Sequence, residues 1–242
     1  MTRVAVAIPA RMTSSRLPGK PIRSLGGIPL IKRCYDCVVE AGYDTFVLTD
    51  SQEIADIIRP EGAAFVDGIE YRNGTERIAG WAEKGLFKNY DVVINCQGDQ
   101  PWIDVEWLHK VARATSKNHL DPHTIVHLYG EIGEDEEDDP SVVKMVVSES
   151  VPQQMMWASR SFTYGKRFVG IYGFKKQFLM RHNELPVKEG ELHENIEQLR
   201  WIENGFKVKA IPVEVPKGFV DINTQNDVEK WYEYSGQSLG ND

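Results

Sequence analysis

The chain has 242 residues, 41% of them hydrophobic and 26% charged, which are ordinary values for a globular protein with a sizeable core. The net charge of −8 argues against a general nucleic-acid binder, because such a protein needs a basic surface to neutralise phosphates. The apolar runs are too short to span a bilayer, and the first residues lack the pattern of a signal peptide. We therefore expect a cytoplasmic protein with a single domain over residues 1–242 and no membrane partner.

The first half of the chain alternates predicted strands with predicted helices. Four short apolar runs have the composition of strands that are buried on both faces of a sheet: residues 4–8, 45–49, 63–66 and 91–96. Helices are predicted to follow them: residues 29–41, a helix with a capping box at Asp50 and Glu53, one from Asn73 to about residue 84, and one from Asp104 to about residue 118. This alternation is typical of a parallel sheet with helices on both faces.

The second half of the chain has a different pattern. Four strand-like runs follow one another without a full helix between them: residues 124–129, 142–147, 155–159 and 168–174. These runs predict antiparallel additions to the sheet. Helices are expected again near 175–184, 191–204 and 224–234, and a last strand at 207–215. We therefore predict an α/β fold with three layers, α/β/α, around a mixed sheet.

Two patterns resemble metal or redox sites, but structural roles explain them better. Cys34 and Cys37 form a CxxC, yet they fall on the apolar stripe of a predicted helix, and the sequence holds no second CxxC. We expect them to pack as small apolar residues. Residues 131–139 are rich in Asp and Glu, and their mutual repulsion favours a solvated loop over a metal site.

The loop after the first strand carries the most informative sequence, PARMTSSRLPGKP at residues 9–21. It contains three cations, Arg11, Arg16 and Lys20, and no acidic residue. In doubly wound sheets ligands bind beyond the carboxyl ends of the strands, where this loop is expected. Arginine can grip phosphate with two parallel hydrogen bonds, and lysine provides a mobile charge. The loop therefore predicts a phosphate site, with a solvated basic turn as the alternative. It is neither a Walker A loop nor a GxGxxG motif.

Four segments of the chain resemble, in order, the motifs of the 3-deoxy-manno-octulosonate (Kdo) cytidylyltransferases. They are IPAR, Ser14 and RLPGKP within residues 8–21, NGTER at 73–77, QGDQP at 97–101 and GIYGF at 170–174, and EQLR at 197–200 with Asp221 extends the match. The resemblance covers nearly the whole chain. It implies a nucleotide-diphospho-sugar transferase-like (Rossmann-like) fold, a homodimer, and Mg²⁺-dependent transfer of CMP from CTP to the anomeric hydroxyl of a 2-keto-3-deoxy sugar acid, with release of pyrophosphate.

The resemblance also implies roles for individual residues. The expected catalytic residues are Arg11, Lys20 and Asp99, and the expected Mg²⁺ ligands are Asp99 and Asp221. The nucleotide is expected to contact Pro9, Ala10, Arg11, Ser14, Lys20, Asn73, Gly74, Arg77, Gln97 and Asp99. The chemistry agrees, since nucleotidyl transfer needs preorganised cations and Mg²⁺ favours carboxylates together with phosphate oxygens. The alternatives are a plain helix cap for Asn73, a surface position for Arg77 and a turn position for Asp221.

The part of the expected site that would bind the sugar matches the family pattern less closely than the part that would bind the nucleotide. The resemblance implies that the sugar contacts Arg16, Gln97, Arg160, Glu197 and Gln198. The two arginines suit the carboxylate of a sugar acid, while a solvated helix face is the alternative for Glu197. The chain departs from the family pattern where Gln100 replaces a Glu, where Phe168 replaces a sugar-binding His, and in a much shorter loop at 161–167. We therefore predict a changed pocket for a sugar acid related to Kdo.

Other functions remain open at this point. One alternative is a nucleotidyltransferase for another acceptor, such as a nonulosonic acid or a sugar phosphate, and another is a CTP-binding regulator without catalysis. A nucleotide-sugar-dependent glycosyltransferase is disfavoured, because DQP at 99–101 is not the DxD motif that such enzymes usually show. For the homodimer, residues 155–157 and the strand 168–174 are the predicted interface, with burial in the core as the alternative.

Overall fold

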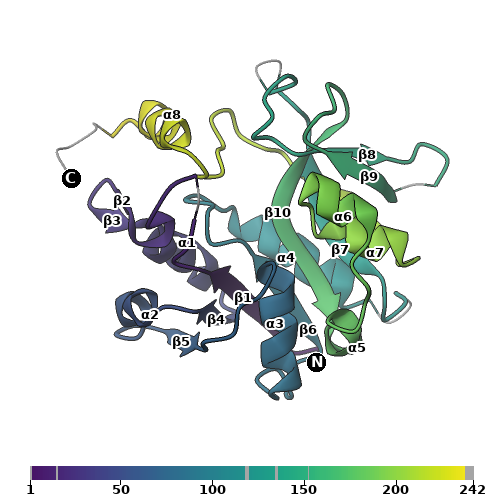
Figure 1. Cartoon of the computed structure of the whole chain (residues 1–242), viewed down its shortest axis with the longest axis horizontal. Coiled ribbons are helices and arrows are strands. Elements are labelled where there is room, and N and C mark those ends of the chain that lie inside the picture. The colour runs from purple at the N-terminus through teal and green to yellow at the C-terminus, as the bar shows by residue number, and fades with distance from the viewer. Residues whose placement is uncertain (1, 15, 118–119, 134–135, 152, 238–242) are drawn as a thin grey trace.

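A nine-stranded mixed sheet forms the centre of the molecule (Figure 1). The structure is a computed structural model that describes residues 2–14, 16–117, 120–133, 136–151 and 153–237. The strands of the sheet are β1 (Val4–Ala10), β4 (Asp44–Thr49), β5 (Ala63–Val66), β6 (Val92–Cys96), β7 (Ile125–Gly130), β8 (Lys144–Val147), β9 (Met155–Ser159), β10 (Lys166–Lys175) and β11 (Val208–Pro212). A separate hairpin consists of β2 (Ser24–Leu25) and β3 (Ile28–Pro29).

The strand order explains why the sheet is mixed. The main path runs β11-β7-β10-β6-β1-β4-β5, while β8 pairs with β10 and β9 pairs with β8. β10 is antiparallel to both β6 and β7, whereas the β1, β4, β5 and β6 pairings and the β7–β11 pairing are parallel. The predicted parallel first half and antiparallel additions are therefore confirmed.

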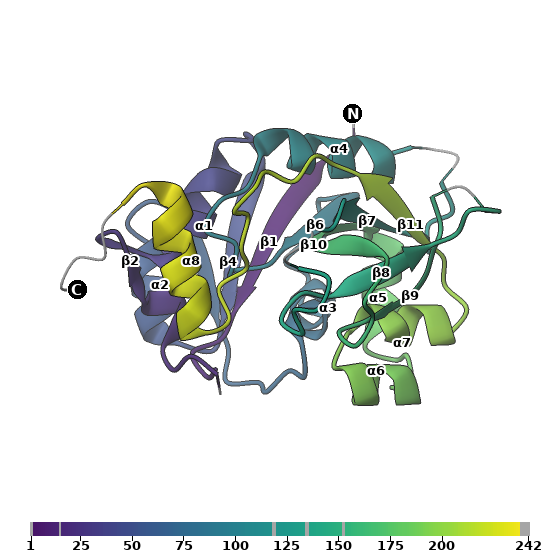
Figure 2. The ribbon, with the colours of Figure 1, turned by 90° about the horizontal axis from the view of Figure 1, so that it is seen from above.

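Helices cover both faces of the sheet (Figure 2). They are α1 (Leu30–Val39), α2 (Gln52–Ile58), α3 (Gly74–Glu83), α4 (Val105–Thr115), α5 (Lys176–His182), α6 (Glu189–Glu194), α7 (Gln198–Glu203) and α8 (Gln225–Ser235). Val6 and Ile8 of β1 belong to a core with α1, α2 and α4, whereas Ala5 and Ala7 belong to a core with α3, α5 and α7. This division follows from the two-residue period of a strand, and it produces the three predicted layers.

Most elements lie within a few residues of their predicted positions, but two predictions are wrong. Ser51, and not Asp50, is the N-cap of α2, because its hydroxyl accepts a hydrogen bond from Ile54 N at 3.4 Å. The single helix predicted over 191–204 is in fact α6 and α7. They are separated at Asn195, whose φ of 53° is left-handed and cannot continue a right-handed helix. α4 ends at Thr115, and the predicted end near 118 lies outside the described residues.

β10 lies in the interior of the sheet, between β6 and β7. Its residues Val169, Ile171 and Phe174 are fully buried within the chain. Burial in the core, the alternative that the sequence left open, therefore accounts for the strand predicted over 168–174. Of the other proposed interface residues, Met155 is buried, whereas Met156 on β9 is 46% exposed.

The cysteines and the acidic run have structural surroundings. Cys34 is fully buried, and its thiol donates a hydrogen bond to Gln100 O at 3.0 Å. Within the described ranges, no group of three or more His, Cys, Asp and Glu side chains forms a metal site. In the acidic run, Glu136 and Asp139 are held by ion pairs to Arg167 and Lys230, so the described part of this loop is less solvated than predicted. No helix in the part of the chain that the structure covers is long and apolar enough to be a membrane span.

Candidate functional site

A cleft of about 730 Å³ opens at the carboxyl edge of the parallel strands. Every residue that the sequence predicted for the site lines it: Pro9, Ala10, Arg11, Ser14, Arg16, Lys20, Asn73, Gly74, Arg77, Gln97, Asp99, Arg160, Glu197, Gln198 and Asp221. The strand order explains the position of the cleft. β4 and β6 pair with opposite sides of β1, so the connections diverge there and leave a crevice at this edge.

The basic loop after β1 is attached to the protein at several points. Leu17 is buried in a cluster with residues of α8. Met12 N donates a hydrogen bond to Asp50 Oδ1 at 3.0 Å, which is a role for Asp50 that the sequence did not reveal. Gly19 adopts a φ of 66° immediately before Lys20, a conformation that glycine reaches without steric cost. These contacts fix the backbone from which Lys20 extends into the cleft.

One cation of the loop, Lys20, meets a carboxylate from the segment that follows β6. Lys20 Nζ donates hydrogen bonds to Asp99 Oδ2 at 2.9 Å and to Asn223 Oδ1 at 3.2 Å. Arg16 Nη2 donates to the same Asn223 oxygen at 3.1 Å. Residues nearly the whole chain apart therefore converge, as the resemblance implied for Lys20 and Asp99. Asn223 was not predicted, and its signal in the sequence is limited to its place two residues after Asp221.

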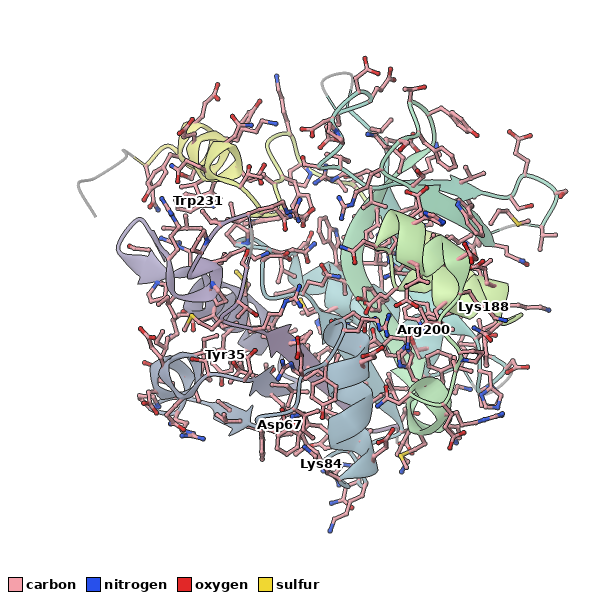
Figure 3. All side chains as sticks on the ribbon, in the orientation of Figure 1. Tyr35, Asp67, Lys84, Lys188, Arg200 and Trp231 are labelled. Carbon is pink, nitrogen blue, oxygen red and sulfur yellow. The ribbon has the colours of Figure 1, made fainter. Side chains whose placement is uncertain are left out.

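Arg11 and Arg77 both line the cleft, but their surroundings differ. Arg11 is exposed to solvent. Arg77 is 3% exposed, and its guanidinium pairs with Asp50 and Asp67, each at 3.5 Å. Burial lowers the pKa of Arg77, while the two carboxylates oppose that change. Asp67 also pairs with Lys84 at 2.6 Å, near the end of α3 (Figure 3). A phosphate would therefore gain more from Arg11 than from Arg77, whose charge is already balanced.

The N-terminus of α3 faces the cleft. Asn73 is the N-cap, the alternative role that the sequence left open, and its Oδ1 accepts a hydrogen bond from Glu76 N at 2.9 Å. A Cβ at position 74 would lie 2.8 Å from Pro9 Cγ, so only a glycine lets this helix end approach β1 so closely. The helix start and the end of β1 therefore form one continuous wall of the cleft.

Glu197 is buried and does not lie on a solvated helix face. It is 8% exposed, and it accepts hydrogen bonds from the Tyr172 hydroxyl and from Thr75 N, the latter at 3.1 Å. Burial raises the pKa of Glu197, while these donors oppose the rise. Gln97 Nε2 donates to the Tyr172 hydroxyl at 3.1 Å. Glu197 and Gln97 thus line the cleft as members of one internal hydrogen-bond network.

Arg200 connects the helices on the two sides of the cleft (Figure 3). It is 1% exposed, and its Nη2 pairs with Glu76 of α3 and with Glu191 of α6, each at 2.6 Å. Asn73 Nδ2 donates a further hydrogen bond to Glu191 Oε1 at 3.1 Å. Because each buried charge is paired, this network holds α3, α6 and α7 in one arrangement.

Asp99 and Asp221 are adjacent in the cleft. Their backbone segments meet where Ile222 N donates a hydrogen bond to Asp99 O at 2.8 Å. Burial raises the pKa of Asp221 to about 6, Arg167 opposes the rise, and the charge of Asp99 adds to it. Asp99 Oδ1 is buried and accepts no hydrogen bond from the described residues. These features fit Mg²⁺, which needs only one or two carboxylates when phosphate oxygens and waters complete its shell.

Two residues without a predicted role hold Asp221. Gln100 Nε2 donates a hydrogen bond to Asp221 Oδ1 at 2.9 Å, and Arg167 Nη2 donates to Oδ2 at 3.3 Å. Arg167 is 2% exposed and also pairs with Glu136 of the acidic loop. The departure from Glu to Gln at position 100 has a physical consequence, since a glutamine donates to Asp221 where a glutamate would repel it.

The far end of the cleft combines cations with an aromatic wall. Arg160 Nη1 donates a hydrogen bond to Ser141 O at 2.8 Å. Burial lowers the pKa of Arg160, and the nearby Arg16 lowers it further. Glu194 Oε2 accepts a hydrogen bond from Arg160 N at 3.3 Å, and Phe168 contributes its ring to the lining. This end can therefore bind an anionic group between two arginines, beside the Asp99–Asp221 pair.

Comparisons with known proteins agree with this geometry. The family model described as cytidylyltransferase matches residues 5–211. The 3-deoxy-manno-octulosonate cytidylyltransferase of Francisella tularensis subsp. novicida is 32% identical over 247 residues, which cover 95% of this chain and 97% of that protein. The protein of the same name from Flavobacterium johnsoniae is 35% identical over 242 residues, with coverage of 94% and 96%.

Solved structures confirm the predicted fold. The structure of CMP:2-keto-3-deoxy-manno-octonic acid synthetase complexed with CTP superposes with a TM-score of 0.83 and 28% identity, covering 98% of this chain and 100% of that one. A putative glucose-1-phosphate thymidylyltransferase from Bacillus anthracis has a TM-score of 0.69 at 10% identity, with coverage of 99% and 98%, and shares the fold alone.

Proposed function

The chain belongs to the cytidylyltransferase family, and from this premise we propose that it transfers CMP from CTP to the anomeric hydroxyl of Kdo or a Kdo-like sugar acid, with release of pyrophosphate. The observation that carries the proposal is the single cleft that Arg11, Lys20, Asp99 and Asp221 line together. The names of the relatives and the CTP-bound structure support the choice of nucleotide and sugar.

The triphosphate is bound by the cations of the loop. Lys20 and Arg11 neutralise the negative charge that develops on the α-phosphate and on the departing pyrophosphate. Lys20 pairs with Asp99 at 2.9 Å, so a preorganised counter-charge keeps the lysine within the cleft before CTP binds. Arg11 is exposed and available to the outer phosphates.

Asp99 and Asp221 would hold Mg²⁺. When bound, this ion acts as a Lewis acid on the α-phosphoryl group and lowers the pKa of the attacking hydroxyl. The protein prepares the two ligands in different ways. Asp99 keeps one buried oxygen without a hydrogen bond from the described residues, while Gln100 and Arg167 fix the carboxylate of Asp221.

The reaction itself is an in-line displacement. The anomeric oxygen of the sugar forms a bond to the α-phosphorus while the bond from phosphorus to the pyrophosphate oxygen breaks, and the hydroxyl proton passes to solvent water. Arg160 and Arg16 orient the sugar by its carboxylate, so that the hydroxyl lies beside the α-phosphate. Because both reactants are held in the complex, the reaction becomes effectively unimolecular, and the entropic part of its barrier is lower.

Cytosine is recognised at the junction of β1 and α3. The side-chain amide of Asn73 already has two hydrogen bonds within the protein. Its Oδ1 accepts one from Glu76 N, and its Nδ2 donates one to Glu191 Oε1. The base is therefore read mainly by backbone groups near Ala10 and Gly74, which both line the cleft.

A substrate screen tests the proposed function. The purified protein is incubated with Mg²⁺, each of four nucleoside triphosphates, and a panel of acceptors, with pyrophosphate release and product mass as readouts. We expect a CMP-sugar from CTP and a 2-keto-3-deoxy sugar acid. A product from a nonulosonic acid or a sugar phosphate would assign another acceptor. CTP binding without pyrophosphate release across the panel would contradict catalysis and favour a regulator.

The metal assignment has its own test, the Asp99→Asn variant. The variant should need at least ~10-fold more Mg²⁺ for half-maximal activity, because it loses one anionic ligand. Electron paramagnetic resonance of Mn²⁺ with CTP measures ion binding without turnover, and the variant should bind less Mn²⁺ than the wild type. Unchanged Mn²⁺ binding and unchanged Mg²⁺ dependence would remove Asp99 from the metal site.

We also propose that the protein acts as a homodimer in the cytoplasm. β9 supports this proposal, because it pairs with β8 along one side and carries the exposed Met156. An exposed apolar residue on a strand at the edge of a sheet is a common place for two chains to associate.

A further inference from the structure

A buried polar pair lies behind the wall of the cleft at its sugar end. His127 on β7 is fully buried, and Gln198 at the start of α7 is 1% exposed and lines the cleft. The ring of His127 stacks on Tyr172 with a centroid distance of 5.1 Å, and its centroid lies 4.2 Å from that of Phe168, a second lining residue. His127 therefore packs against Phe168 of the wall without lining the cleft itself.

The hydrogen bonds of His127 define its tautomer. Its Nδ1 lies 2.7 Å from Leu128 O, and because a carbonyl oxygen can only accept, Nδ1 carries the proton. Burial lowers the pKa of His127 to about 3, so the ring is neutral at physiological pH. A neutral ring protonated on Nδ1 has a lone pair on Nε2, and this nitrogen is a hydrogen-bond acceptor.

This acceptor determines how the amide of Gln198 is oriented. Gln198 Nε2 lies 3.5 Å from His127 Nε2, where the amide N–H can donate to the lone pair. A flipped amide would set the Gln198 carbonyl oxygen against that lone pair, and two acceptors repel each other. With its nitrogen engaged by His127, Gln198 has its carbonyl oxygen left for a ligand.

We propose that His127 is a positioning residue for the acceptor sugar, because it orients Gln198 so that the amide carbonyl accepts a hydrogen bond from a donor group of the sugar. The donor would be a hydroxyl of the sugar acid. The inference rests on the proposed function in so far as the ligand at this end is the sugar. Since it is costly for a bound ligand to cover an acceptor without donating to it, this arrangement selects for sugars that carry a donor at this position.

A double-mutant cycle tests the inference with CTP and the acceptor found in the screen. His127→Phe keeps the aromatic ring but removes the acceptor nitrogen, and Gln198→Leu removes the amide. Each single variant should raise the KM for the sugar by ~10-fold, with kcat and the KM for CTP nearly unchanged. The double variant should be no worse than Gln198→Leu alone, because His127 acts through Gln198. Effects that multiply in the double variant would overturn the proposal.

A matched control is available in His182, a second fully buried histidine, which lies on α5 outside the cleft lining. Burial lowers the pKa of His182 to about 4, so its ring is also neutral. His182→Phe should leave the KM for the sugar unchanged. An equal rise in KM for both histidine variants would assign the effect to general loss of packing and contradict a positioning role.

Nuclear magnetic resonance tests the inference without any substrate. The imidazole nitrogen shifts of His127 should show the neutral ring protonated on Nδ1 throughout pH 5 to 8. In a Gln198→Glu variant whose fold is checked by circular dichroism, a carboxylate replaces the amide donor and should raise the pKa of His127 measurably. A ring protonated on Nε2, or a pKa insensitive to Gln198→Glu, would overturn the proposal. Because this readout involves no turnover, it separates failure of the inference from failure of the proposed function.

Discussion

Lys20 is the residue whose contacts most directly predict a kinetic effect. Its Nζ joins the loop after β1 to Asp99 and Asn223 within the cleft. The Lys20→Ala variant should lower kcat by ~100- to 1,000-fold, which is the usual cost of removing one preorganised group that stabilises transition-state charge. Steady-state kinetics of pyrophosphate release would measure the loss, and circular dichroism would establish that the fold is retained.

Lys32 provides the control for that substitution. It also forms short ion pairs, with Asp36 at 2.6 Å and Glu61 at 2.8 Å, but it does not line the cleft. Lys32→Ala should therefore leave kcat within about twofold of the wild type, as expected for a surface ion pair. Near-normal turnover in a folded Lys20→Ala protein would remove Lys20 from the mechanism.

Asp221 predicts a pH dependence of stability. Burial raises its pKa to about 6 in the folded state, above the value of ~3.9 expected in the unfolded chain. The folded state binds the proton more tightly, so Asp221 contributes stability below pH ~4 that is lost as the pH rises through about 6. Asp221→Asn does not titrate, and it should gain stability relative to the wild type over this window.

The size of that gain follows from the shift and the exposure of the side chain. The difference between a pKa of about 6 and one of ~3.9 corresponds to ~3 kcal/mol, and solvent screening of a side chain that is 30% exposed reduces this to ~1–2 kcal/mol. Between pH 4 and 7.5, the difference in Tm should therefore move by roughly 3–6 °C in favour of the variant. Calorimetry without Mg²⁺ or CTP would measure it, and a difference in Tm that is constant with pH would contradict the raised pKa.

At the scale of elements, Asn195 separates α6 from α7 and thereby places Glu197 and Gln198 against the cleft. Its φ of 53° costs an alanine ~1–2 kcal/mol, whereas a glycine adopts it freely. We expect Asn195→Ala to lower Tm by roughly 2–6 °C and to raise the KM for the sugar more than that for CTP. Asn195→Gly should change both little. Equal stability of the two variants would show that the left-handed residue is not what ends α6.

The separation of α6 from α7 at Asn195 could not be predicted from the sequence. Strand and helix positions in the first half follow from apolar periodicity, which depends on neighbouring residues. An asparagine inside a helical pattern gives no local sign of a left-handed conformation, because the packing of α7 under β9 and β11 decides it. The N-cap of α2 was predicted wrongly for a similar reason. Asp50 and Ser51 are neighbours and both are favoured N-cap residues, so the sequence pattern does not distinguish between them.

The site shows the same division between local and long-range information. The site residues were predictable because they fall in segments that resemble the family's motifs in the same order, and every residue predicted for the site lines the cleft. Gln100, Arg167 and Asn223 could not be assigned, because each acts through a partner far away in the sequence. His127 is a further case, since its effect depends on a ring nitrogen that faces Gln198, 71 residues later.

On the scale of the whole molecule, the cleft draws on both halves of the chain. The loop after β1 and the N-terminus of α3 line it from the first half, whereas α6, α7 and the segment around Asp221 line it from the second half. Arg200 joins the two sides through Glu76 and Glu191. Because the second half completes both the sheet and the cleft, we expect that neither half alone binds both proposed substrates.

β9 carries the surface through which two chains are expected to associate. The strand pairs with β8, and Met156 on it is 46% exposed. If a second copy covers this face, the protein should sediment at twice the chain mass of 27.5 kDa. Met156→Glu should shift the protein to the monomer, because burying an unpaired carboxylate in an interface costs several kcal/mol.

Met180 on α5 gives the matched control, since it is 44% exposed and lies outside β9. Met180→Glu should leave the sedimentation of the dimer unchanged. A wild-type protein that sediments as a monomer at micromolar concentration would exclude the dimer. A dimer that survives Met156→Glu but dissociates in Met180→Glu would move the interface to α5. The helix α5 packs on α3, so such an interface would approach the nucleotide side of the cleft instead of its sugar side.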